Sequence, residues 1–267
     1  MTNLCVVASD AARVHDALAR AAAVIERVAR TEEDEDDDEA ASGVQSGFID
    51  QARGRHQSSR RVAPGSERVL TSVSTFTRRT RLALGCAIDA ASNAIAKSLD
   101  DAWASAPKGT WGGKGSALVK SAKSKSANGD PSHSTSPAAD AVREQILAPL
   151  RKALGSLDPR VSSVIGPRAA AAATQGYLAR LLAEGPRGVR AKRGGVARVE
   201  LDVEATIAAA GEPAIEVAPV SGSGARSAMS AWRSAARRAR AVVMLAKGGD
   251  GAGLPGEEVE EWRKVFA

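Results

Sequence analysis

Residues 171–210, AAATQGYLARLLAEGPRGVRAKRGGVARVELDVEATIAAA, contain the pattern that decides the fold. An alanine-rich helical pattern runs through Tyr177 and ends at Gly185-Pro186, a pair of residues that typically ends helices. A basic turn then leads to Gly194-Gly195, after which apolar residues recur three or four positions apart, at Val196, Val199, Val203 and Ile207. The stretch therefore predicts two helices joined at a corner marked by glycines, against which the other helices pack.

The composition predicts thin helical cores. Of the 267 residues 43% are hydrophobic, but only 3% are aromatic and many of the others are alanine. Alanine favours the helical state yet buries little apolar area, so we expect stability to depend partly on a partner. The two cysteines, Cys5 and Cys86, have no metal-ligand spacing and indicate a reducing compartment. No apolar run approaches the ~20 residues of a membrane span, and the predicted location is the cytoplasm.

Residues 1–31 are predicted to form an amphipathic helix. Its apolar residues alternate three and four apart and define one stripe, at Ala11, Val14, Leu18, Ala21, Ile25 and Val28. This is the spacing of a bundle helix or of a coiled-coil seam. The acidic run from Glu32 to Glu39 is expected to end the helix in solvent, within an acidic and Gly/Ser-rich linker over residues 32–65.

A long helix is predicted over residues 66–106, followed by a Ser/Lys/Gly-rich insertion over residues 107–137 that is expected to be disordered. The stripe of the long helix runs through Val69, Val73, Phe76, Thr80, Leu84, Ile88, Ala91, Ile95, Leu99 and Trp103. We expect both this stripe and the Val14 to Val28 stripe to bury themselves against the C-terminal helices or against a partner's helices.

The remainder, residues 138–267, is predicted to be a C-terminal helical domain. Prolines suggest a kink at Pro149, a helix start at Pro159 and a bend at Pro167. One helix is expected to stop at Gly211, and Ala214 to Ala218 show the only strand-like alternation in the chain. Further helices carry the apolar stripe Met229 to Ala246 and, after Pro255, the stripe Val259 to Phe266.

The sequence displays no motif for catalysis, and a non-enzymatic protein is predicted. The three histidines, His15, His56 and His133, lie in separate segments without metal-ligand neighbours. The glycine-rich segment 109–116 fails the spacing of a phosphate-binding loop, and segment 222–227 has a serine where a dinucleotide fingerprint needs its third glycine. No cofactor and no metal are expected.

An arginine-rich face on one predicted helix indicates a different class of function. Four arginines, Arg233, Arg237, Arg238 and Arg240, cluster on one predicted helix, where they could contact the phosphates of nucleic acid or an anionic membrane surface. The cluster lacks the interleaved aromatic residues of a nucleic-acid-binding module. A solvated helix face is the plainer interpretation.

Three aromatic residues also allow two interpretations, as core residues or as contacts for a partner. Trp232, Trp262 and Phe266 lie on the apolar stripes of their helices, which favours a place in the core. The terminal face around Trp262 and Phe266 could equally anchor a partner helix.

The C-terminal half resembles a known family. A helix with Tyr177 and Leu181, a glycine-containing turn and then a helix with Leu201, Asp202 and Val203 resembles the C-terminal domain of the coiled-coil domain-containing protein 142 family, which is related in pattern to helical-rod vesicle-tethering subunits. The similar region covers Ala138 to Phe266. The resemblance implies an all-helical, non-enzymatic subunit that contacts other proteins, with no cofactor, and it implies that these residues meet between two helices.

The sequence thus predicts an all-α protein, built as an antiparallel helix bundle or helical rod with two disordered low-complexity segments. The predicted function is a protein–protein interaction or scaffold module, akin to a tethering-complex subunit. The alternative is a basic nucleic-acid-binding protein that uses its arginine-rich helix faces.

Overall fold

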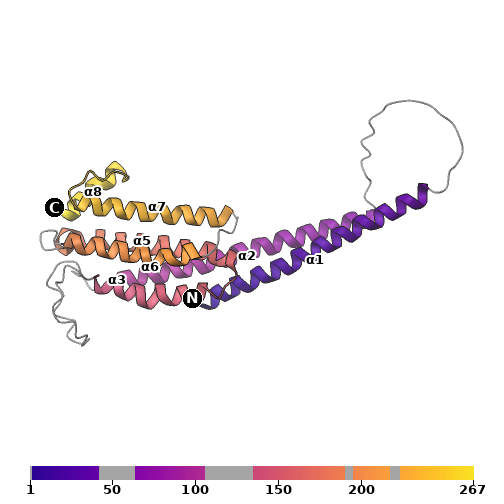
Figure 1. Ribbon diagram of the computed structural model, residues 1–267, viewed down its shortest axis with the longest axis horizontal. Helices are drawn as coiled ribbons and strands as arrows, with labels where there is room; N and C mark the ends of the chain where they lie inside the picture. The colour runs from indigo at the N-terminus through magenta and orange to yellow at the C-terminus, as the bar shows by residue number, and fades with distance from the viewer. Residues whose placement is uncertain (1, 42–63, 106–134, 190–194, 217–222) are drawn as a thin grey trace, which may run out of the picture. The chain divides into compact units, whose positions relative to one another are not determined.

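The chain is all-α. The structure is a computed structural model that describes residues 2–41, 64–105, 135–189, 195–216 and 223–267 (Figure 1). These residues form helices joined by turns, with no strand among them, so the predicted fold class is confirmed. The elements are α1 (Thr2–Ala41), α2 (Pro64–Ser105), α3 (Pro137–Val142), the π-helix η3 (Arg143–Leu147), α4 (Ala148–Leu154), α5 (Pro159–Val189), α6 (Gly195–Glu216), α7 (Ser223–Ala246) and α8 (Gly256–Phe266).

The chain divides into two compact units. Unit 1 combines residues 1–9 with residues 87–267, and unit 2 is the segment 10–86. The division passes through both α1 and α2, so each of these helices contributes to both units. Most of the predicted linker, at 42–63, and most of the predicted insertion, at 106–134, lie outside the described residues.

Helix α5 is the centre of unit 1. It packs on α4, α6, α7 and α8 (Figure 1). Most of its residues from Val161 to Leu178 are buried. A helix buried on all sides needs small side chains, because neighbouring backbones must approach it from several directions. The alanines at 169–173 meet this need, which explains why α5 contains the alanine run that opens the decisive stretch.

The predicted corner between the two decisive helices is present. Gly185 interrupts α5 with a φ of 63° and a ψ of −168°, a conformation that glycine adopts more readily than other residues. Helix α6 then begins at Gly195 and packs along α5. The basic residues of the turn between them, 190–194, lie outside the described residues.

Trp103 joins the end of α2 to the middle of α5 within unit 1. Its indole Nε1 donates to the Ala173 carbonyl at 3.2 Å, and its ring meets Tyr177 edge-on with centroids 5.4 Å apart. Gly176 provides the space for this ring, because a Cβ atom at that position would lie 2.6 Å from Trp103 Cδ1. This glycine is therefore required by close packing rather than by backbone conformation.

Two helices extend beyond their predicted ends. Helix α1 continues through the acidic run to Ala41, and α6 continues through Gly211 to Glu216. The prediction of a strand beginning at Ala214 is therefore wrong for the residues up to Glu216, which are helical. A short alternating run needs a partner strand, and the described part of the chain contains no strand.

The two prolines at which a kink or a bend was predicted lie within continuous helical segments. Helix α5 runs through Pro167 without a break. Before Pro149 the helix widens into the π-helix η3, in which the Ala148 N–H donates to the Arg143 carbonyl, five residues earlier. Proline has no N–H to offer to the carbonyl of the previous turn, and a wider turn at this point accommodates that missing bond.

Candidate functional site

Two features of the described residues could bind another molecule. One is a groove on unit 1 between η3 and α6, and the other is an exposed apolar face on unit 2. The interaction candidates predicted on the C-terminal helices belong to neither, and their positions are described first.

The predicted interaction residues lie mainly in the core of unit 1. Tyr177, Leu181, Asp202, Val203, Trp232 and Trp262 are buried, whereas Leu201 and Phe266 are half-buried. The Trp262 ring stacks on Phe266, with their centroids 5.9 Å apart. These side chains build the helix interfaces of unit 1.

Asp202 forms the main polar link inside unit 1. Its side chain is fully buried, and its Oδ1 accepts the Ser136 N–H at 2.6 Å. Its Oδ2 lies 3.4 Å from the Tyr177 hydroxyl. Ser136 in turn caps α3, because its Oγ accepts the Ala139 N–H. Asp202 therefore holds the start of α3 against α6, and Tyr177 connects the same carboxylate to α5.

The predicted basic face on α7 is partly engaged in ion pairs. Arg240 pairs with Glu204 of α6, with Nε and Oε1 at 2.9 Å, and Arg238 pairs with Glu258 of α8 at 2.8 Å. The hydrogen bond from Arg240 lowers the pKa of Glu204, and the same bond raises the pKa of Arg240. Arg233 and Arg237 are exposed. Two of the four arginines thus already have carboxylate partners on neighbouring helices.

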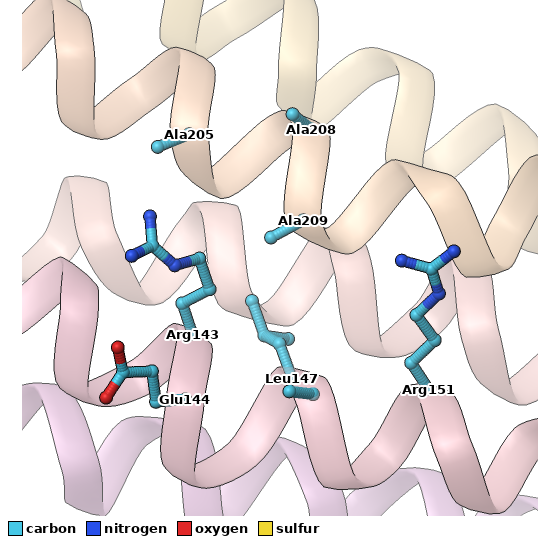
Figure 2. Close-up of a pocket in the computed structure, with 8 residues that line it drawn as sticks. Arg143, Glu144, Leu147, Arg151, Ala205, Ala208 and Ala209 are labelled. Atoms are coloured by element: carbon cyan, nitrogen blue, oxygen red, sulfur yellow. The ribbon is translucent and has the colours of Figure 1, made fainter.

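The groove on unit 1 has an apolar floor and charged edges. Its volume is about 420 Å³, and Arg143, Leu147 and Arg151 follow one another at four-residue intervals along its first wall. Ala205, Ala208 and Ala209 of α6 form the opposite wall (Figure 2). Arg143 also pairs with Asp140 at 2.8 Å. The lining contains no nucleophile or histidine, and it combines alanine and leucine side chains with two guanidinium groups and the carboxylate of Glu144.

The sequence analysis did not single out these groove residues. The regular spacing of Arg143, Leu147 and Arg151 was a visible signal for one wall. The second wall is contributed by α6, more than fifty residues later, and that pairing depends on tertiary structure.

The exposed face on unit 2 follows from how α1 and α2 pack. The His15 imidazole Nδ1 and the Thr80 hydroxyl are 2.9 Å apart, which sets the register of the antiparallel pair. The residues of α1 that face α2 are buried or half-buried, at Ala12, His15, Ala19, Ala22 and Glu26. Those of α2 are half-buried, at Leu70, Val73, Thr77, Thr80 and Leu84. Both rows have the alternating spacing of a coiled-coil seam.

On α1 the seam differs from the predicted stripe, whereas on α2 it keeps Val73, Thr80 and Leu84 of the predicted stripe. Small side chains of α1 make the contact, and the larger apolar residues lie beside it. Ile25 and Val28 are 39% and 49% exposed, and Phe76 is 53% exposed. Alanine at three of the five seam positions of α1 lets the two backbones approach closely, whereas the bulky residues of the predicted stripe would hold them apart.

The bulky residues of the two helices share one side of the hairpin. Leu18 and Ile25 each precede a seam residue in α1, and Val69 and Phe76 each precede a seam residue in α2. The two helices of an antiparallel pair are related by a twofold axis perpendicular to them. Residues that hold the same position relative to the seam in each helix therefore lie on the same side of it, and these four residues share one side. Counting along both helices from the contact between His15 and Thr80 places Phe76 within one residue of the level of Leu18, and Val69 within one residue of the level of Ile25.

We call this surface the hairpin face and define it by the exposed residues Val14, Ile25, Val28, Val69 and Phe76 together with the half-buried Leu18. The other flank of the seam is polar and carries Asp16, Ser74 and Arg81. Val24 and Leu82 are also exposed, but they lie away from the face. A row of exposed apolar side chains bordered by polar residues is typical of a protein interaction surface.

Other kinds of site find less support in the described residues. They contain no group of three or more histidine, cysteine or acidic residues that could hold a metal ion, and no helix among them is long and apolar enough to cross a membrane. His15 has a threonine hydroxyl as its recorded partner, while His56 and His133 lie outside the described residues. Comparison of the chain with protein-family models, with curated proteins and with solved structures gave no match.

Proposed function

We propose that this chain is a non-enzymatic helical interaction module that binds another protein chain through the hairpin face. The observation that carries the proposal is the one-sided exposure of bulky apolar side chains along α1 and α2, of which Val14 (56% exposed) and Phe76 (53%) are examples. Burying such a row on a partner helix releases water from each side chain and contributes about 25 cal/mol per Å² of apolar surface.

The resemblance to tethering subunits supports the same class of function. It suggests a scaffold-like role next to other helical subunits, and it remains a proposal for this chain. Free cysteines, with Cys5 buried and Cys86 exposed, suit a protein of the cytoplasm.

The alternative, binding of nucleic acid, has weaker support. Its predicted face needs free guanidinium groups, but Arg238 and Arg240 already pair with Glu258 and Glu204. A phosphate would have to displace these carboxylates. We therefore favour contact with another protein.

The proposal is tested by capturing the full chain from the cell that makes it. Ile25→Glu combined with Phe76→Glu places two charges on the hairpin face and should remove the bound protein. The control is Ser74→Glu, an exposed position on the polar flank of α2, and it should retain the partner. Equal recovery of all partners by both variants would refute the proposal, provided that circular dichroism shows the same helical content in both.

A further inference from the structure

The outer side of α7 is lined, along its N-terminal half, by side chains that can donate hydrogen bonds. The apolar side of this helix, with Ala228, Trp232 and Ala236, is buried in the core of unit 1. The opposite side carries three arginines and three serines, all exposed, at Arg226, Ser227, Ser230, Arg233, Ser234 and Arg237. We call these six residues the α7 donor surface. Each guanidinium offers five N–H groups and each serine one O–H group.

The three arginines of the α7 donor surface form one row. Arg226, Arg233 and Arg237 are separated by seven and four positions, a spacing that places them on the same side of a helix. At 1.5 Å per residue the row rises by roughly 16 Å along α7. Helix α7 contains no acidic residue. No carboxylate of the same helix therefore lies between these arginines.

Carboxylates of neighbouring helices reach the C-terminal part of α7. Arg238, Arg240 and Lys247 pair there with glutamates of α6 or α8, and α8 lies beside this part of α7 (Figure 1). The row of three arginines forms no ion pair with any other residue that the structure describes. An anion bound to this row would displace no carboxylate, in contrast to one bound at Arg238 or Arg240.

The arginines of the hairpin are arranged differently. Arg78 and Arg79 of α2 are exposed but consecutive, and consecutive residues point about 100° apart around a helix. On α1, Arg13 pairs with Asp10 at 3.6 Å, and every residue from 32 to 39 of the same helix is acidic. A polyanion laid along α1 would therefore meet carboxylates, whereas one laid along α7 meets none from that helix.

The α7 donor surface lacks the groups that most other partners would bind. Protein interfaces rely on aromatic and large apolar anchors, and the nearest exposed large hydrophobic residue of α7 is Met244, seven positions beyond Arg237. A membrane-bound helix inserts its apolar side into lipid, but that side of α7 is packed on α5. Single-stranded nucleic acid stacks its bases on aromatic rings, and Trp232 of α7 is buried.

We propose that the α7 donor surface binds the phosphate backbone of double-stranded nucleic acid, as a second binding surface beside the hairpin face. Phosphate oxygens accept hydrogen bonds chiefly from arginine, lysine, serine and similar side chains, and this surface consists of arginine and serine. A duplex carries one charge per about 1.7 Å of its axis, so the row of arginines spans several phosphates. Such a contact reads no base sequence. The proposal goes beyond the protein contact proposed above and does not rest on it.

The salt dependence of duplex binding tests this proposal. Fluorescence anisotropy of a labelled DNA duplex, titrated with the full chain at several salt concentrations, measures it. Each phosphate contact contributes about −0.9 to the slope of log K against log salt concentration, so three arginines predict a slope of about −2.7. Binding should therefore weaken roughly fortyfold between about 50 and 200 mM salt. Absence of binding at about 50 mM salt would overturn the proposal.

Two pairs of substitutions locate the contact. Arg233→Gln combined with Arg237→Gln leaves one arginine in the row, so the slope should fall to about −0.9 and the effect of salt to roughly threefold. Arg78→Gln combined with Arg79→Gln removes the same charge from exposed positions of α2 and should keep the wild-type slope. Equal losses in the two pairs would show that net charge is responsible, and the α7 donor surface would then be the wrong assignment.

An acidic residue within the row gives an independent test. Ser230→Glu places a carboxylate between Arg226 and Arg233 and should weaken duplex binding at least about tenfold, because it repels phosphate. Ser74→Glu, at an exposed serine of α2, should bind as the wild type does. Circular dichroism checks that both variants keep their helical content. Unchanged binding by a folded Ser230→Glu variant would contradict the proposal.

Other anionic probes compare the duplex with rival partners. Polyglutamate, a single DNA strand and vesicles that contain phosphatidylserine should each bind more weakly than the duplex under the same conditions. Tighter binding of any of them, lost on the Arg233→Gln and Arg237→Gln substitutions, would overturn the choice of a duplex. Ile25→Glu combined with Phe76→Glu should bind the duplex as the wild type does, so failure here is distinguishable from failure of the hairpin face.

Discussion

At the scale of single residues, the packing of Trp103 against α5 depends on a missing side chain. Gly176→Ala would place a methyl group 2.6 Å from Trp103 Cδ1, and this ring is only 2% exposed and bonded to Ala173. We expect the variant to lose about 1–3 kcal/mol of unfolding free energy, the usual cost of overpacking. Chemical denaturation followed by circular dichroism measures it.

The matched control is a glycine with free space around it. Gly85 lies inside α2, and a Cβ atom there would meet nothing within 4 Å. Gly85→Ala should raise stability by up to about 1 kcal/mol through helix propensity. Changes of the same sign in both variants would contradict the assigned role of Gly176.

Asp202 is the second residue whose role can be tested directly. Asp202→Ala leaves the buried Ser136 N–H without its acceptor and should cost about 2–3 kcal/mol of unfolding free energy. Glu204→Ala, two residues along the same helix with a side chain that is about half exposed, should cost less than about 1 kcal/mol. A similar loss in both variants would show that Asp202 does not anchor α3.

At the scale of elements, the ion pair between α6 and α7 predicts a pH dependence. The folded-state pKa of Glu204 lies below its ordinary value, chiefly because Arg240 donates a hydrogen bond to it. A lowered pKa means that the pair stabilises the fold above the unfolded pKa of about 4.3 and that this contribution disappears as the pH falls through the folded value. The pair is exposed, so the contribution should stay below about 1 kcal/mol.

Unfolding of Glu204→Gln at pH 7 and pH 3 measures this contribution. The variant should be less stable than the wild type at pH 7 and equally stable at pH 3. Adding Arg240→Gln in that background should cost little more at pH 7, because its partner is already neutral. A deficit that persists at pH 3 would mean that Glu204 acts through packing rather than charge.

Helix positions were largely readable from the sequence, because apolar spacing and glycine or proline signals are local. The start of α5 at Pro159, the break at Gly185 and the last helix after Pro255 follow from such signals. The contacts that place the helices were less readable. The bond between Asp202 and Ser136 spans 66 positions, and no local pattern encodes it.

The candidate face shows the same division. The bulky stripe from Val14 to Val28 was visible in the sequence, but the sequence did not show which residues of α1 pack against α2. The hairpin packs through the smaller side chains at Ala12, Ala19 and Ala22, because two helices approach more closely along alanine than along valine and isoleucine. The stripe that was predicted to be buried is thereby left available to a partner.

At the scale of the whole molecule, the two units have different compositions of buried surface. Unit 1 buries Trp103, Trp232, Trp262 and Tyr177 around α5, whereas the seam of unit 2 combines three leucine or valine residues with alanine, threonine and a histidine. Less apolar area is buried per residue in such a seam. Unit 2 is therefore expected to gain more stability than unit 1 when the hairpin face is covered.

Site-specific photo-crosslinking tests the central claim most directly. A benzophenone amino acid in place of Phe76 retains an aromatic ring on the hairpin face, and the same residue in place of Ser74 samples the polar flank. Illumination of living cells should link position 76 to another protein chain, with little product from position 74. Equal labelling from both positions, or none from position 76, would contradict the assignment of the hairpin face as the interaction surface.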